Sequence, residues 1–133
     1  MKAGEKIFVH TNYELVNKLL NKDLKGWMST VYKFSDYPQY CDAFIWMVYL
    51  DGKKHYGWVN NCHNTSILED YVGGKPYPNN IDDGLNIKRR FVFEKVGNGA
   101  KRYYVFRGFY ELETGSNREH RVLRMISNEA DLF

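Results

Sequence analysis

The spacing of apolar positions along the chain predicts two helices. Segment 13–22 carries apolar residues at helical spacing, and Thr11 and Asn12 before it are residue types that cap helix N-termini. A second, short helix is predicted within 64–74, because Ser66 followed by Glu69 fits a capping box and Gly73 suits a helix exit. Both helices are thus expected in the first two thirds of the chain.

The remaining periodic segments predict strands. Asp51-Gly52 lies between two strand-like runs and predicts a hairpin over 42–61, since both residues tolerate positive φ. The first of these runs is apolar on both faces, which is typical of a central strand. A second hairpin is predicted over 89–113, around a Gly-Asn-Gly turn. Further strands are expected at 6–10, 27–34 and 120–127, and a long loop at 73–86.

This order of elements predicts an α+β fold with a largely antiparallel, partly closed β-barrel, one N-terminal helix and one short helix. The 133 residues are enough for one hydrophobic core, so residues 1–133 are interpreted as a single domain.

Composition changes this picture in two ways. Aromatic residues make up 17% of the chain, and aromatic residues are frequent in strands and on recognition surfaces. The net charge is +3, but from Lys88 to Arg107 there are seven basic residues and one acid, Glu94. Positive charge is therefore concentrated on the second hairpin, which favours a polyanionic partner.

The sequence predicts a cytoplasmic protein. Cys41 and Cys62 have no CxxC spacing and are interpreted as reduced thiols. The first residues lack the apolar region of a secretory signal, and the longest apolar run, 43–50, is too short to cross a bilayer.

No catalytic residue, metal ligand or cofactor is predicted. The sequence contains no nucleophile elbow, phosphate-binding loop, dinucleotide fingerprint or zinc-protease motif. Cys62 and His63 are neighbours and would point to opposite faces of a strand. Glu94 is followed directly by Lys95, whereas a D…E-x-K nuclease motif places these two residue types on one face. Catalysis is therefore disfavoured.

The second hairpin carries cations and aromatic rings side by side. Cations contact phosphates and planar rings stack on bases, so this mixture suits a nucleic acid. The alternative is that its aromatic residues form the core, which is the default for large apolar side chains. The residues concerned are Phe91, Phe93, Tyr104 and Phe106.

A second aromatic group suggests a base pocket. Tyr56, Trp58 and Asn60 alternate and are expected on one face, where two rings stack a flipped base and an amide reads its edge. The alternative is that Trp58 packs against Trp46 as a cross-strand pair in the core.

The stretch KRYYVFRGFYELE resembles a strand of PUA-like barrels, in particular SRA-like domains. The matching residues are Arg102, Tyr103 or Tyr104, Gly108, Tyr110 and Leu112. The resemblance covers about the last third of the chain. It implies a reader domain that flips a modified base into an aromatic-lined pocket. Some such domains occur in modification-dependent restriction systems, and others in the superfamily bind RNA. The chain is shorter and shows no attached nuclease domain, so recognition is implied and cleavage is not.

The resulting hypothesis is a non-enzymatic module that binds DNA or RNA and reads a modified or flipped base. Two alternatives stay open: a protein-interaction module of a defence or mobile-element system, and a small-ligand enzyme without a recognisable motif. The predicted nucleic-acid contacts are Arg89, Arg90, Arg102, Arg107 and, in the long loop, Lys75, and the predicted base pocket is Tyr56, Trp58 and Asn60.

Overall fold

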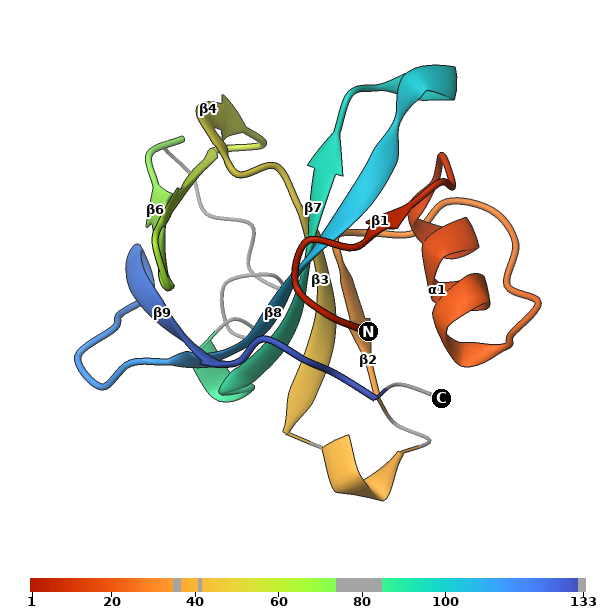
Figure 1. Cartoon of the computed structure of the whole chain (residues 1–133). Coiled ribbons are helices and arrows are strands. Elements are labelled where there is room, and N and C mark those ends of the chain that lie inside the picture. The colour runs from red at the N-terminus through yellow and green to blue at the C-terminus, as the bar shows by residue number, and fades with distance from the viewer. Residues whose placement is uncertain (35–36, 41, 74–84, 132–133) are drawn as a thin grey trace.

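The structure is a computed structural model that describes residues 1–34, 37–40, 42–73 and 85–131. In this part of the chain nine strands form one sheet in the order β2-β3-β7-β8-β9-β6-β5-β4, and β1 pairs with β8 beside this path (Figure 1). The strands are β1 (Lys6–Ile7), β2 (Val31–Lys33), β3 (Ala43–Val48), β4 (Asp51–His55), β5 (Trp58–His63), β6 (Ser66–Tyr71), β7 (Arg89–Val96), β8 (Tyr103–Leu112) and β9 (His120–Ser127).

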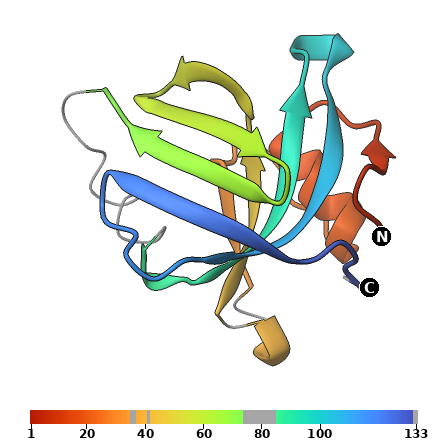
Figure 2. The ribbon, with the colours of Figure 1, turned by 60° about the vertical axis from the view of Figure 1, so that its left-hand side comes forward.

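The sheet is mixed and open. β3 runs parallel to β7, whereas the other strand pairs are antiparallel. β2 and β4 are the two ends of the strand order, so the sheet does not close into the expected barrel. It curves instead, and β4, β5 and β6 lie across from β2, β3 and β7 (Figures 1 and 2). The fold is thus mostly β, with a curved sheet.

The N-terminal helix is confirmed as α1 (Asn12–Leu20). The hydroxyl of Thr11 caps it by accepting a hydrogen bond from the backbone N–H of Glu14, and Asn21 ends it with φ of 52°. The apolar face packs on one side of the sheet, where it shares a core with aromatic residues of β7 and β8. The buried helix residues are Leu15, Val16, Leu19 and Leu20.

The second hairpin is confirmed as β7 and β8, joined through a 3₁₀ turn, η2 (Gly99–Lys101). Phe91, Phe93, Tyr104 and Phe106 are at most 2% exposed. These four rings are core residues, so the core interpretation holds for them. The register shifts where Val92 faces Gly108 and Phe93 faces Phe106, which leaves Arg107 as an extra residue in β8.

The predicted second helix is wrong, because Ser66–Tyr71 is strand β6. Its side chains alternate, with Ile67, Glu69 and Tyr71 buried and the residues between them half-exposed. β6 pairs with β5 on one side and β9 on the other. Two neighbouring strands therefore override a local pattern that also fits a capping box.

The predicted turn at Asp51-Gly52 is also wrong. Both residues belong to β4, where the pairing with β5 is irregular between Asp51 and Lys54. The turn is Tyr56-Gly57, with φ of 52° and 89°, which suits a two-residue hairpin turn between His55 and Trp58. β3 pairs with β2 and β7 and not with β4, consistent with the central position that its apolar residues predict.

The other predicted strands are present, two of them shorter than expected. The first covers Lys6–Ile7, the strand expected at 27–34 covers Val31–Lys33, and the strand at 120–127 is confirmed as β9. A 3₁₀ turn, η1 (Pro38–Tyr40), precedes β3. No helix of the described residues is long and apolar enough to cross a membrane. Cys62 is an exposed free thiol, and Cys41 lies outside the described residues.

Candidate functional site

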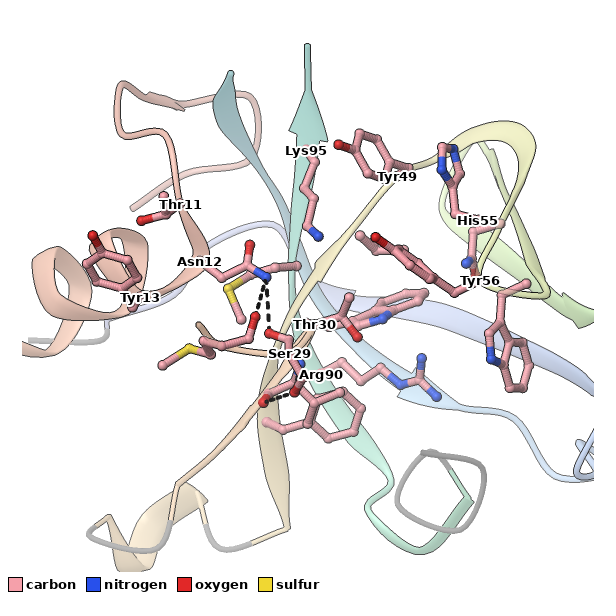
Figure 3. A pocket seen from close by; sticks show the side chains of 18 of the residues that line it. Thr11, Asn12, Tyr13, Ser29, Thr30, Tyr49, His55, Tyr56, Arg90 and Lys95 are labelled. Atoms are coloured by element: carbon pink, nitrogen blue, oxygen red, sulfur yellow. Dashed lines mark hydrogen bonds between the residues drawn. The ribbon is translucent and has the colours of Figure 1, made fainter. Parts of the chain in front are cut away.

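A cavity of about 630 Å³ lies inside the curve of the sheet and reaches the start of α1 (Figure 3). Its walls come from strands β3 to β7 and β9, from the first residues of α1 and from segment 26–31. Four cationic side chains line it, Arg90, Lys95, Arg102 and Arg121, together with one carboxylate, Glu69. The cavity therefore carries an excess of positive charge.

The first group in the cavity, called the Glu69 cluster, consists of Glu69, Arg90 and Arg121. Oε1 of Glu69 accepts hydrogen bonds from Arg90 Nη1 at 3.0 Å and from Arg121 Nη1 at 3.2 Å. The three side chains are 7%, 1% and 2% exposed. They come from β6, β7 and β9, and Glu69 faces Arg121 directly in the pairing of β6 with β9. One carboxylate thus neutralises part of two desolvated positive charges.

Aromatic rings hold the two guanidinium groups of this cluster in place. The Arg90 guanidinium lies 4.5 Å from the ring centre of Trp46 and 5.0 Å from that of Phe44. The Arg121 guanidinium lies 4.7 Å from the ring centre of Trp58. Such cation–π contacts attract the charge to the ring faces and fix the plane of each group. The cavity wall is therefore flat, aromatic and cationic.

Asn60 adds an acceptor to this wall. It faces Glu69 in the pairing of β5 with β6 and is 5% exposed. Within the described residues, no hydrogen-bond donor reaches its buried side-chain oxygen. A buried acceptor without a donor is unfavourable, so this oxygen is available to a donor on a ligand.

The second group, called the Tyr49 cluster, consists of Tyr49, His55, Lys95 and Arg102. The Tyr49 ring stacks on His55 at 4.3 Å, and the Lys95 ammonium lies 5.2 Å from its centre. Nη2 of Arg102 donates a hydrogen bond to the Tyr49 hydroxyl. Figure 3 shows Tyr49 beside His55 on one side of the cavity, with the Lys95 side chain pointing into it.

Lys95 has an altered acidity. Burial, and after it the positive charge of Arg102, lower the pKa of Lys95 to about 8. Tyr104, which faces Lys95 across the hairpin, has the opposite shift, since burial raises its pKa to about 12. It stays protonated and donates to Oδ1 of Asn12 at 2.6 Å, which ties α1 to the sheet beside the cavity.

Two exposed aromatic residues lie among the residues that line the cavity. Trp27 is 90% exposed and Tyr56 is 78% exposed. Tyr56 owes its position to the two-residue turn with Gly57, and Trp27 follows Gly26 in the segment that leads to β2. Large exposed rings at a cavity are available for contact with a ligand.

The residues predicted for the base pocket lie together. Tyr56, Trp58 and Asn60 all line the cavity, and so does Trp46, which is 4% exposed. The alternative cross-strand pair of Trp46 and Trp58 is wrong, because β3 and β5 are not neighbours in the sheet. Trp58 instead packs on Tyr71, with ring centres 5.0 Å apart.

The residues predicted to contact phosphate do not lie together in the structure. Arg102 lines the cavity, and Arg90 is buried in its wall, so a phosphate contact on the outer surface does not fit Arg90. Arg89 and Arg107 do not line the cavity; Arg89 pairs with Asp42, and Arg107 pairs with Glu94. Lys75 lies outside the described residues.

Sequence reasoning missed several cavity residues. The sequence pattern suggests Glu69 as part of a helix cap, and it suggests Lys95 as one of the basic residues of the second hairpin and as the neighbour of Glu94 in the nuclease comparison, but it does not place either side chain in a cavity. For Glu69 a signal existed, since an acid between Ile67 and Tyr71 at alternating positions indicates an inward carboxylate. The other missed residues are Trp27, Tyr49, His55 and Arg121. Among the described residues, no three His, Cys, Asp or Glu side chains gather to hold a metal ion.

Comparisons with known proteins find a similar fold but no similar sequence. The sequence matches no protein-family model and no curated protein. A solved structure, that of the 5-hydroxymethylcytosine-specific restriction enzyme AbaSI, superposes with a TM-score of 0.69 at 17% sequence identity. The match covers 96% of this chain and 40% of the AbaSI chain, so this chain spans less than half of that enzyme's length. At this identity the likeness shows the fold alone. This chain therefore shares its fold with part of the AbaSI chain.

Proposed function

We propose that this chain recognises a modified base in DNA, which leaves the base stack and enters the cavity. The observation that carries the proposal is the wall formed by Trp46, Trp58 and Asn60, with flat rings beside a buried oxygen that no described donor reaches. Rings stack on any base, whereas an acceptor at a fixed position distinguishes one base edge from another.

The size of the cavity supports this proposal. Small-molecule sites usually have volumes of about 300–1,000 Å³, and this cavity has about 630 Å³. A base stacked inside a duplex does not reach a cavity of the protein, so the nucleotide has to rotate out of the helix, which costs a few kcal/mol of stacking and pairing.

We assign different roles to the residues around the cavity. Tyr56, exposed in its turn, stacks on the extruded base or on its neighbour. Trp58 lies deeper and holds Arg121 in place, and Asn60 accepts a hydrogen bond from the base edge. Arg102 reaches the cavity from the turn end of the second hairpin, directly after η2, and contacts the nucleotide there.

In this proposal, exposed lysines rather than Arg89 and Arg107 contact the phosphates outside the cavity. Arg89 and Arg107 each hold an acidic neighbour, so a phosphate has to compete with Asp42 or Glu94. Lys25 and Lys54 are exposed and are the chain neighbours of Gly26 and His55, which line the cavity. Binding through such contacts weakens as salt concentration rises, because counterions return to the DNA.

The fold supports DNA as the partner class, because the superposed enzyme is named for its specificity for 5-hydroxymethylcytosine. The test is fluorescence anisotropy with short duplexes that carry cytosine, 5-methylcytosine or 5-hydroxymethylcytosine at one central position, at two salt concentrations. We expect at least tenfold tighter binding of one modified duplex and weaker binding of all duplexes at high salt.

Tyr56→Ala examines the role of the cavity in that assay. Stacking of a base on an aromatic ring contributes about 1–3 kcal/mol, so we expect about 5- to 150-fold weaker binding. The matched control is Phe8→Ala, because Phe8 is 71% exposed and does not line the cavity. Equal affinities for all duplexes, or equal losses in both variants, would disprove modified-base recognition in this cavity.

A further inference from the structure

Lys95 is a buried cation without an acidic partner. It is 9% exposed and lines the cavity, and no carboxylate of the described residues forms an ion pair with it. The Lys95 ammonium lies over the face of the Tyr49 ring, 5.2 Å from the ring centre. Glu94, the next residue in the chain, is engaged by Arg107. Burying an ammonium group without a carboxylate is unfavourable, so its position calls for a compensating group.

A second cation makes this arrangement less favourable still. Arg102 lies close enough for its positive charge to lower the pKa of Lys95. Nη2 of Arg102 donates to Tyr49, while its Nε is buried and reaches no acceptor within the described residues. The Lys95 ammonium and the Arg102 guanidinium thus lie over the same ring, at 5.2 and 5.6 Å from its centre.

The rest of the cavity does not supply the missing negative charge. Glu69 is the only carboxylate among the described lining residues, and both Arg90 and Arg121 already donate to it. The lining therefore has three more cationic side chains than acidic ones. An arrangement of this kind is poised to bind an anion.

We infer that Lys95, Arg102 and the Tyr49 hydroxyl form an anion-binding subsite inside the cavity, which takes a compact oxyanion, either a phosphate or a carboxylate. The ammonium and the guanidinium supply the positive charge. The Tyr49 hydroxyl accepts its hydrogen bond from Arg102, so its own proton is directed elsewhere and can be donated to an anionic oxygen.

Two sources of the oxyanion share this chemistry. One is the phosphate of the nucleotide whose base occupies the cavity, and the other is a carboxylate on the base itself, as in 5-carboxylcytosine. That the anion arrives on a nucleotide rests on the proposed function, whereas the subsite itself follows from the side chains. Inorganic phosphate therefore tests the subsite independently.

The first experiment titrates inorganic phosphate into the full chain at constant ionic strength and follows backbone amide chemical shifts. We expect saturable shifts at Lys95, Arg102 and Tyr49. Lys95→Met keeps the length of the side chain without its charge and is expected to weaken phosphate binding at least tenfold. It removes a desolvated charge, so it is not expected to unfold the chain. Lys101→Met is the matched control, because Lys101 is exposed and does not line the cavity, and it leaves the affinity unchanged.

Absence of saturable shifts in the unsubstituted chain would overturn the inference. So would equal affinities in the unsubstituted chain and in Lys95→Met, because the ammonium would then not contact the anion. A loss that is as large in Lys101→Met would point to nonspecific screening and overturn it as well.

The second experiment identifies the source by comparing deoxycytidine, deoxycytidine 5′-monophosphate and 5-carboxyl-deoxycytidine. Tighter binding of the monophosphate, abolished by Lys95→Met, assigns the subsite to the nucleotide phosphate. Tighter binding of the carboxyl nucleoside, with the same dependence on Lys95, assigns it to the base. Equal binding of all three contradicts the inference.

Failure of this inference is distinguishable from failure of the proposed function. If duplexes with a modified base are preferred but phosphate does not bind at Lys95, the subsite is wrong and modified-base recognition stands. If phosphate binds at Lys95 but no modified duplex is preferred, the subsite stands and modified-base recognition is wrong.

Discussion

Replacing Glu69 by glutamine examines how the charged wall of the cavity is held together. The change keeps the size of the side chain and removes the negative charge that Arg90 and Arg121 share. Both arginine side chains are at most 2% exposed, so water does not replace the lost carboxylate. The variant therefore leaves two desolvated positive charges close together.

The expected loss of stability is large. Removing one partner of a buried ion pair costs about 3–5 kcal/mol. The rings of Phe44, Trp46 and Trp58 still attract the two guanidinium groups, with about 0.5–2 kcal/mol for such a contact, so we place the loss near the lower limit, at about 3 kcal/mol. For a chain of 133 residues this corresponds to a fall in melting temperature of roughly 10 °C.

The assay is urea denaturation, followed by tryptophan fluorescence and by circular dichroism. Asp42→Asn is the matched control, because Asp42 pairs with Arg89 but is 53% exposed. An exposed pair contributes about 0–1 kcal/mol. Adding Arg121→Met to Glu69→Gln removes one of the two excess charges and should recover part of the stability. If Glu69→Gln loses no more free energy of unfolding than Asp42→Asn, Glu69 does not stabilise buried charges.

Two further predictions concern Lys95 and the turn at Gly57. The pKa of Lys95 falls to about 8 on folding, so between pH 8 and about 10 the unfolded chain binds more protons and the free energy of unfolding rises with pH. Lys95→Met removes this rise, and urea denaturation at pH 8 and pH 10 measures it; an identical slope in both proteins would contradict the assignment. Gly57 has φ of 89°, and a Cβ there would lie 2.6 Å from Tyr71 Cε2, so Gly57→Ala should cost about 1–3 kcal/mol. Gly99→Ala is its control, because Gly99 also has positive φ but no atom within 4 Å, and equal losses would remove the contact with Tyr71 as the cause.

Local patterns predicted the elements that local forces determine. Thr11 caps α1 through a contact three residues away, and the second hairpin combines alternating aromatic residues with a tight turn. Both signals lie within a few residues of the structure that they predict. By contrast, Ser66–Tyr71 becomes a strand because β5 and β9 pair with its two edges, and β9 begins about fifty residues later in the chain. No short window of sequence contains that information.

The candidate site shows the same limit of local patterns. Tyr56, Trp58 and Asn60 are close in sequence and all line the cavity, with Tyr56 in the turn before β5 and the other two residues in the strand. Glu69 and Arg121 come from different strands and meet only when β6 pairs with β9. Their contact depends on the register of two distant segments, which the sequence pattern does not specify.

The parallel pairing of β3 with β7 connects the fold to the chemistry of the cavity. In this register Phe44 lies opposite Arg90 and Trp46 lies opposite Val92, so the Arg90 side chain extends across two aromatic rings. A β3–β4 hairpin, as the sequence suggested, would have given Trp46 other neighbours. The aromatic and cationic wall is thus a consequence of one strand pairing.

The structure also shows that the basic side chains of the second hairpin do not form one surface. Its concentration of positive charge suggests a continuous phosphate-binding surface, but the structure directs the side chains to different places. Arg89 and Arg107 hold Asp42 and Glu94 outside the cavity, whereas Arg90, Lys95 and Arg102 line its interior. Arg90 and Lys95 are buried, and the charge of a buried side chain acts more strongly on a ligand than the same charge on an exposed strand. The hairpin therefore contributes its positive charge mainly to what enters the cavity, and a ligand with a negative group near Lys95 gains most from it.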